Sequence, residues 1–307
     1  MNLKKKIFSF LNNLRNRSET LPESAIINDS GSLIRNRNPE PLFVMDNKLL
    51  SGKSALITGA GRNIGRSIAL EMGRQGADIF FTDIDRDSCV KLEQELKEFQ
   101  VRSKGFLSDI SKTEDIDALH NFLVREKIVI DILVNNVGVR LDHDDYNDIR
   151  DIDPAIWQKT FAANVFGPMY LTKLISQLMV SNEIHGSILF ITSIHESVPA
   201  GWTCYSSSKA ALAMIVKELS LDVAPHRIRV NGIAPGYVSE NEHGIPFDFK
   251  YAPLHKTSIN PCYIGRAAVY LASDYFSRFT TGTVIRVDAG LSLYNFRIAD
   301  NRSHNGI

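Results

Sequence analysis

The sequence predicts a single α/β domain with a doubly wound, mostly parallel seven-stranded sheet flanked by helices. From residue 51 onward, short runs rich in β-branched and aromatic residues alternate with longer stretches of helical period. The short runs are apolar throughout, which is typical of strands buried on both faces of a parallel sheet. In such sheets ligands bind beyond the carboxyl ends of the strands, so a site is expected there.

The alternation assigns each element in turn. Strands are predicted at residues 54–58, 78–82, 103–107, 131–135, 186–192, 227–233 and 283–287. Helices are predicted between them at residues 63–75, 87–99, 113–126, 154–181, 204–224 and 261–273. These elements define one domain over residues 49–293, with an N-terminal arm at residues 1–48 and a C-terminal tail at residues 294–307.

The N-terminal arm differs from the domain in composition. Residues 15–47 are rich in Asn, Ser, Pro and Arg without a sustained period, which favours a linker or a loosely packed arm. Upstream, one helical face carries apolar side chains with basic residues around it, namely Leu3, Ile7, Phe10 and Leu14. We interpret the arm as partly disordered or as a short amphipathic helix. A helix that contacts a membrane surface or a partner is a less favoured alternative, and a transit peptide is a third.

Composition argues against several classes of protein. The 307 residues include 35 Lys+Arg and 35 Asp+Glu, and this zero net charge disfavours a nucleic-acid-binding protein. No apolar run reaches the roughly 18 residues of a membrane-spanning helix. The three cysteines, Cys89, Cys204 and Cys262, are widely spaced, which favours a reducing, cytoplasmic location over a disulfide framework or a zinc site. His243 and His255 lack further ligands at metal spacing, so we expect no metal site.

A glycine-rich turn follows the first predicted strand. Gly59 and Gly61 lie between that strand and the next predicted helix, and Gly65 lies in the first turn of that helix. Glycines there let the backbone turn tightly and approach a pyrophosphate, which then lies at the helix N-terminus. The last glycine comes one residue later than in the most common dinucleotide-binding pattern, and such a turn by itself can be only a tight loop.

The end of the second strand supports the dinucleotide interpretation. Asp83 follows Gly65 by 18 residues, where a carboxylate can accept hydrogen bonds from a ribose and repel a 2′-phosphate. This favours NAD(H) over NADP(H). Arg62 in the glycine turn points the other way, because a guanidinium can pair with a phosphate. A solvated turn or a helix cap is the alternative for Asp83, since two further aspartates follow closely.

A candidate catalytic pair lies on the predicted helix at residues 204–224. Tyr205 and Lys209 are four residues apart and therefore share one helix face. A free tyrosine has a pKa near 10, and a neighbouring ammonium favours its phenolate form. Ser193 ends the strand just upstream, where a hydroxyl could hydrogen-bond a substrate oxygen as charge develops.

In their order and approximate spacing, these motifs resemble the short-chain dehydrogenase/reductase family. The matching residues are Thr58-Gly59 to Gly65, Asn135-Asn136-Val137-Gly138, Asn164, Ser193, Tyr205, Lys209, Pro235-Gly236 and Val287-Asp288-Ala289-Gly290. The resemblance covers residues 49–293. It implies a single Rossmann-type domain, usually assembled as a homotetramer or homodimer, and reversible hydride transfer between a nicotinamide and a secondary alcohol or ketone.

The resemblance also implies residue roles. Tyr205 would be the general acid/base, Lys209 would lower its pKa and bind the nicotinamide ribose, and Ser193 would polarise the substrate oxygen. Asn164 would hold a water that links Lys209 to solvent. The implied cofactor-binding residues are Gly59, Gly61, Arg62, Asn63, Ile64, Gly65, Asp83, Asp109, Ile110, Asn136, Gly138, Tyr205, Lys209, Pro235, Gly236 and Val238.

Several positions depart from the family pattern. Asn63 replaces a usual glycine, and asparagine tolerates left-handed backbone better than most residues, so the turn should survive. Val137 and Ala289 are modest changes. Glu240 stands where a threonine commonly contacts the cofactor, and Ser239 is the expected substitute.

The substrate is expected between two variable segments, residues 194–204 and 237–261. His195 and Trp202 lie in the first, and the mixture of aromatic and polar side chains suits a ring or a polyhydroxylated compound. Arg140 could meet an anionic substrate, although pairing with the acidic loop at residues 142–153 is favoured.

These observations predict an oxidoreductase for a small secondary alcohol or ketone. An NADPH-linked 3-oxoacyl-thioester reductase is the alternative within that class. A non-catalytic cofactor-binding protein tethered by its arm is the alternative outside it.

Overall fold

The computed structural model describes residues 48–141, 153–239 and 252–293, together with two short strands in the N-terminal arm. The chain divides into two units, Met1–Val44 and Met45–Ile307. In the first unit, β1 (Ala25–Ile27) pairs antiparallel with β2 (Leu33–Arg35). These two short strands are not among the predicted ones, and the interpretation of residues 1–48 as a linker or loosely packed arm stays a prediction. The predicted N-terminal helix lies outside the described residues.

The second unit is built on one seven-stranded sheet in which every neighbouring pair is parallel. The strands are β3 (Ser54–Thr58), β4 (Asp78–Asp83), β5 (Ser103–Leu107), β6 (Ile132–Asn135), β7 (Ser187–Ile191), β8 (Arg229–Pro235) and β9 (Val284–Val287). Their order is β5-β4-β3-β6-β7-β8-β9. The chain therefore winds outward from β3 in one direction and returns to β6 in the other, which confirms the doubly wound fold.

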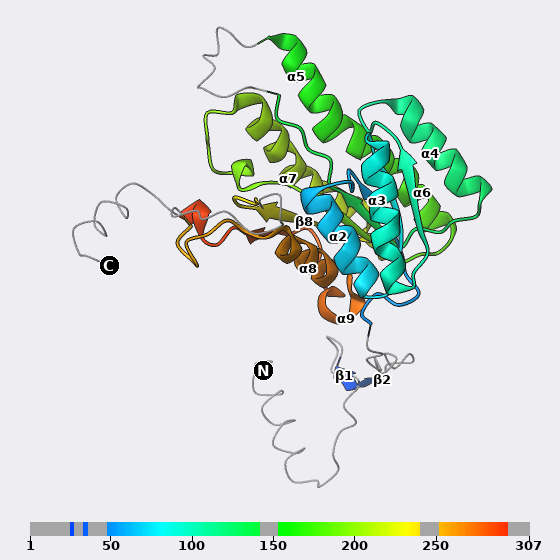
Figure 1. Cartoon of the computed structure of the whole chain (residues 1–307). Coiled ribbons are helices and arrows are strands. Elements are labelled where there is room, and N and C mark those ends of the chain that lie inside the picture. The colour runs from blue at the N-terminus through cyan, green and yellow to red at the C-terminus, as the bar shows by residue number, and fades with distance from the viewer. Residues whose placement is uncertain (1–24, 28–32, 36–47, 142–152, 240–251, 294–307) are drawn as a thin grey trace, which may run out of the picture. The chain divides into compact units, whose positions relative to one another are not determined.

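Helices cover both faces of this sheet (Figure 1). One face packs against α2 (Asn63–Arg74), α3 (Arg86–Leu96) and α8 (Pro261–Ala272). The other packs against α4 (Thr113–Arg125), α6 (Gly167–Ser181) and α7 (Thr203–Val223). Elsewhere in the described part of the chain, two further α-helices are α5 (Pro154–Phe161) and the short α9 (Asp274–Ser277). Among the described residues, no helix is long and apolar enough to cross a membrane.

The two helical layers explain the continuous apolar strands. Within β3, Ala55 and Ile57 belong to the core under α2, whereas Leu56 belongs to the core on the opposite face. All three side chains are fully buried. Successive residues of a strand point to opposite faces, so both faces require apolar side chains when both are covered.

The predicted helix at residues 154–181 is wrong in one respect, because it is interrupted. A π-helical turn, Ala162–Phe166, separates α5 from α6. Within this turn the buried Asn164 side chain hydrogen-bonds backbone groups of Val139. Just after it, Gly167 lies so close to the Ile110 carbonyl that a Cβ there would clash. These contacts come from distant parts of the chain, so helical periodicity does not reveal them.

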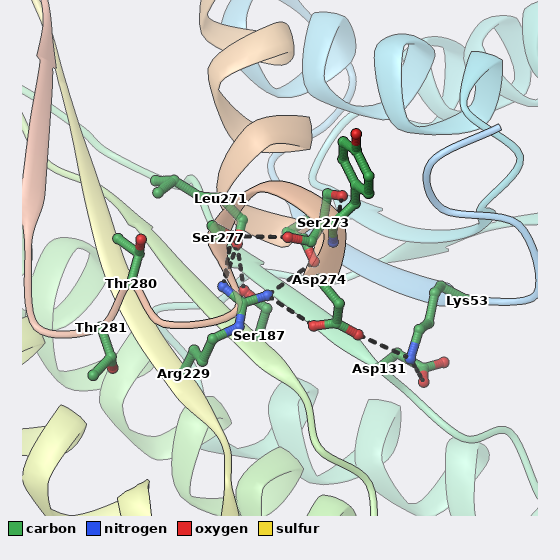
Figure 2. Close-up of polar contacts among 12 residues, drawn as sticks. Lys53, Asp131, Ser187, Arg229, Leu271, Ser273, Asp274, Ser277, Thr280 and Thr281 are labelled. Atoms are coloured by element: carbon green, nitrogen blue, oxygen red, sulfur yellow. Dashed lines mark hydrogen bonds and ion pairs between the residues drawn. The ribbon is translucent and has the colours of Figure 1, made fainter. Parts of the chain in front are cut away.

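A polar network joins the amino ends of several strands (Figure 2). Arg229, at the start of β8, is buried, and its guanidinium donates to the carbonyl oxygens of Leu271 at 2.6 Å and Ala272 at 3.0 Å. It also pairs with Asp274 at 3.3 Å. Lys53 continues the chain of charges from Asp274 to Asp131 at the start of β6. The network therefore holds α8 and α9 to the amino ends of the strands, which is the end of the sheet away from the carboxyl ends of the strands.

Candidate active site

The glycine turn between β3 and α2 is compact because side chains are absent where the backbone folds on itself. A Cβ at Gly65 would clash with the carbonyl oxygen of Gly59, and Gly59 itself has φ 63°. Asn63 opens α2 with φ 47°, the left-handed conformation that the sequence analysis expects it to tolerate. The first turn of α2 thus presents its backbone N–H groups beside a cavity of ≈ 320 Å³.

Asp83 holds the glycine turn from the end of β4. Its Oδ2 accepts a hydrogen bond from the Gly61 N–H at 2.7 Å, and its Oδ1 accepts one from the Asp85 N–H at 3.0 Å. Asp83 lines the same cavity, as does the exposed Arg62. Asp83, which favours NAD(H), and Arg62, which favours the extra phosphate of NADP(H), therefore line the same cavity.

The far wall of this cavity comes from the ends of β5 and β6. Asn136 donates from Nδ2 to the carbonyl oxygens of Thr58 and Gly59, each at 2.9 Å, and so joins β6 to the glycine turn. Asp109 accepts hydrogen bonds from the Ser111 N–H and hydroxyl. Partial burial opposes its ionisation, but these bonds and the nearby Lys112 prevail and lower the pKa of Asp109.

A second cavity of ≈ 780 Å³ adjoins the first at the carboxyl ends of β6, β7 and β8. Ser193, Tyr205 and Lys209 all line it. Four residues border both cavities, namely Asn63, Ile64, Asn136 and Gly138. The two spaces together can hold an elongated ligand that runs from the glycine turn to the Ser-Tyr-Lys group.

Lys209 is the most unusual ionisable group of the site. Only 2% of its surface is exposed, and its Nζ donates to the carbonyl oxygen of Ile191 at 2.9 Å. The Nζ lies 5.6 Å from the centre of the Tyr205 ring. Burial lowers the pKa of Lys209 from 10.5 to about 8. A Cβ at Gly138 would lie 2.8 Å from this Nζ, so the small residue makes room for the amine.

Ser193 is held at the end of β7 by its own chain. It caps the short 3₁₀ helix Ile194–Glu196, and its Oγ accepts a hydrogen bond from the His195 N–H at 3.2 Å. Because the backbone occupies a lone pair of this oxygen, the hydroxyl hydrogen is available for an oxygen atom in the cavity.

Asn164 lies behind the cavity walls. Its side chain bonds the Val139 N–H at 2.7 Å, the Val139 carbonyl at 2.9 Å and the Ser208 hydroxyl at 2.9 Å. Ser208 in turn donates to the Tyr205 carbonyl at 2.7 Å. Asn164 therefore positions the loop after β6 and the first turn of α7.

The structure brings most predicted site residues together. Of the predicted set, only Gly61 and Asn164 are absent from the walls of the two cavities. Wall residues absent from the predicted set include Ile84, Ser108 and Val139, which directly neighbour predicted positions, and Leu291, which comes from far along the chain. Glu240, which stands in place of the usual threonine, lies outside the described residues.

The structure describes Arg140 and Ala289, two residues about which the sequence made a prediction. Arg140 lies over Trp202, with its Cζ 4.3 Å from the ring centre, and both residues line the larger cavity. The acidic loop with which it was expected to pair lies largely outside the described residues. Ala289 has φ 51°, so it adopts the left-handed backbone that glycine usually supplies.

Comparison with known proteins agrees with this geometry. The family model for short chain dehydrogenases matches residues 53–244. The chain is 32% identical to the 7alpha-hydroxysteroid dehydrogenase of Escherichia coli K12, over 81% of this chain and 98% of that protein. It is 29% identical to glucose 1-dehydrogenase 2 of Bacillus subtilis, over 80% and 97% respectively.

A solved structure shares the fold over the same region. A 7 alpha-hydroxysteroid dehydrogenase complexed with NADH and 7-oxo glycochenodeoxycholic acid superposes with a TM-score of 0.70 at 30% identity, covering 78% of this chain and 94% of that one. The chain belongs to the short-chain dehydrogenase/reductase family, and it is an oxidoreductase that acts on CH–OH groups with a nicotinamide cofactor.

Proposed function

We propose that the chain interconverts a secondary alcohol and a ketone through Ser193, Tyr205 and Lys209. The observation that carries this proposal is that all three side chains line one cavity, which adjoins the glycine-turn cavity. When bound, a nicotinamide cofactor accepts or returns a hydride. The glycine turn fits the diphosphate of such a cofactor, since the first residues of α2, Asn63, Ile64 and Gly65, line the glycine-turn cavity, where a helix N-terminus favours an anion.

The side chains then divide the proton chemistry among them. Tyr205 removes the proton of the substrate hydroxyl during oxidation and returns it during reduction. The positive charge on Lys209 favours the phenolate form of Tyr205. Ser193 donates its hydroxyl hydrogen to the substrate oxygen and stabilises the charge that develops there. Asn164 keeps the Tyr205 segment in place through Ser208, and its role in a water relay to Lys209 is part of this proposal.

Replacing Tyr205 tests the proposed chemistry. A panel of secondary alcohols and ketones, assayed at 340 nm with NAD(H) and NADP(H), is expected to give turnover with the wild-type chain. Tyr205→Phe removes only the hydroxyl, so kcat should fall at least about 100-fold while cofactor binding stays intact. Absence of wild-type turnover across the whole panel, with cofactor still bound, would instead identify a non-catalytic cofactor-binding protein.

We propose NAD(H) as the preferred cofactor. Asp83 places a carboxylate on the wall of the glycine-turn cavity, where it can bind ribose hydroxyls and repel a 2′-phosphate. Asp83→Asn keeps an acceptor for the Gly61 N–H but removes the charge. The ratio of kcat/KM for NAD over NADP should then fall about tenfold, as expected for loss of one screened charge repulsion. A wild-type preference for NADPH would contradict the assignment and favour the 3-oxoacyl-thioester reductase alternative.

We further infer that the substrate is a small-molecule alcohol or ketone, that the chain forms a homodimer or homotetramer, and that it acts in the cytoplasm. The relatives act on hydroxysteroids and glucose according to their names, which supports a secondary alcohol.

Aromatic side chains of α8 and α9 are substantially exposed, including Tyr263 and Phe276, which supports a subunit interface. All three cysteines are free thiols, which supports a reducing compartment. Light scattering coupled to gel filtration would measure the assembly.

A further inference from the structure

The backbone of His195 is hydrogen-bonded to the proposed catalytic hydroxyl. His195 lies two residues after Ser193 in the 3₁₀ helix Ile194–Glu196, and its N–H donates to the Ser193 Oγ at 3.2 Å. Its side chain lines the ≈ 780 Å³ cavity together with Tyr205. The centre of the His195 ring lies 6.3 Å from that of the Tyr205 ring, so the imidazole borders the space in which a substrate of Tyr205 would bind.

The His195 ring is held on several sides. Its Nδ1 lies 3.0 Å from the carbonyl oxygen of Val198. The ring meets Trp202 edge-on with centroids 4.7 Å apart, and it meets Tyr205 in the same manner at 6.3 Å. Such contacts restrict rotation of the imidazole, so its second nitrogen has a defined direction.

The hydrogen bond to Val198 determines what the second nitrogen can do. A carbonyl only accepts, so Nδ1 carries the hydrogen of this bond. Burial, together with the charge of Arg140, outweighs the bond to Val198 and lowers the pKa of His195, which favours the neutral ring. In the neutral ring with hydrogen on Nδ1, Nε2 is an acceptor. Within the described part of the chain, Nε2 has no hydrogen-bond partner.

We propose that His195 determines substrate specificity by accepting, at Nε2, a hydrogen bond from a second hydroxyl next to the reacting carbon. The preferred substrates are then vicinal diols and the corresponding α-hydroxy ketones. This inference rests on the proposed function, because it concerns the same cavity. It assigns His195 to substrate binding and leaves the proton transfer to Tyr205.

Matched substrate pairs test the proposal. The kcat/KM for cyclohexane-1,2-diol is compared with that for cyclohexanol, and 2-hydroxycyclohexanone with cyclohexanone. Each pair differs by a single hydroxyl. The wild-type chain should prefer the hydroxylated member at least about tenfold, which corresponds to one satisfied hydrogen bond.

Two variants of His195 separate the acceptor from the bond that holds the ring. In His195→Asn the amide nitrogen lies two bonds from Cβ, as Nδ1 does, so the bond to Val198 is kept. Its only acceptor, Oδ1, is also two bonds from Cβ, so no acceptor remains at the position of Nε2. In His195→Gln the amide oxygen lies three bonds from Cβ, as Nε2 does, so the acceptor is kept. The preference ratio should fall to near one in His195→Asn and should stay within about threefold of wild type in His195→Gln.

The ratio is informative because a general loss of activity affects both members of a pair equally. An unchanged ratio in His195→Asn, or a wild-type ratio near one, would overturn this inference while leaving the alcohol–ketone chemistry intact. A wild-type chain that turns over no member of the broader alcohol and ketone panel would overturn the proposed function, and this inference with it.

Discussion

At the scale of one residue, the buried amine of Lys209 lowers the stability of the folded chain. This amine is buried and donates a hydrogen bond to the Ile191 carbonyl. Burial lowers the pKa of Lys209 to about 8, which is a measure of how strongly the fold disfavours the charged amine. The proposed chemistry nevertheless requires that charge next to Tyr205.

Replacing this lysine should therefore raise stability and remove activity. The pKa difference from 10.5 corresponds to roughly 3 kcal/mol, and losing the bond to Ile191 offsets about 1–2 kcal/mol of it. Lys209→Met is expected to be about 1–2 kcal/mol more stable than wild type at pH 7, measured by urea unfolding, with turnover abolished.

The pH dependence of that difference checks its cause. Below about pH 8 the folded wild type carries the charged amine and bears the full penalty. Between about pH 8 and 10.5 the folded chain holds Lys209 neutral, so folding must release the lysine proton. This release costs less free energy as the pH approaches 10.5, so the penalty shrinks. An advantage of Lys209→Met that stays constant over this range would show that packing, and not the buried charge, is responsible.

At the scale of elements, the Arg229 network holds α8 and α9 to the start of β8 (Figure 2). Arg229→Met keeps much of the buried volume but leaves the Ala272 carbonyl without its donor. We expect a loss of about 2–4 kcal/mol in the free energy of unfolding.

A partly exposed member of the same network provides the control. Lys53→Met removes ion pairs of 3.4 Å and 3.8 Å at a side chain that is 37% exposed, and it should cost less than about 1 kcal/mol. Since Arg229 lies at the opposite end of β8 from Pro235 and Gly236, kcat/KM should be unchanged at temperatures where both variants are folded. Equal losses in the two variants would contradict a special role for the buried guanidinium.

The interrupted helix shows why local sequence patterns do not predict where every helix begins and ends. Residues 154–181 carry a continuous helical pattern, yet the chain forms a π-helical turn at Ala162–Phe166. The turn places Asn164 where it can bond both Val139 and Ser208, which lie 25 residues before it and 44 residues after it. Helical period depends on neighbours within a few positions, so contacts at such separations leave no trace in it.

At the scale of the whole molecule, the N-terminal arm is expected to be dispensable for catalysis. Every residue lining the two cavities belongs to the unit Met45–Ile307. A chain that starts at residue 47 should therefore keep its cofactor affinity and kcat/KM within about twofold, the ordinary effect of changes remote from a site.

Vesicle co-sedimentation tests the alternative role of the arm. The full chain and the shortened chain are compared on vesicles that contain anionic lipids, because basic amphipathic helices bind such surfaces. We expect equal behaviour of the two chains. Sedimentation of the full chain alone would instead assign the arm to membrane attachment.

The sequence by itself determined the order of strands and helices, the family, and the Ser-Tyr-Lys group. These depend on local patterns: apolar runs, a glycine turn after a strand, and a tyrosine and a lysine one helical turn apart. Even the replacement at Asn63 was predictable, because left-handed backbone is a property of the residue itself.

Only the tertiary structure decided the environment of those groups. The depth of Lys209, the place of Asn164 behind the walls, and the packing of His195 against Trp202 each depend on how the chain folds around them. Burial and charge interactions set the pKa and the hydrogen-bonding role of a side chain, and both are sums over neighbours in space. The order of residues identifies the candidate reacting groups, and the fold supplies the surroundings on which their chemistry would depend.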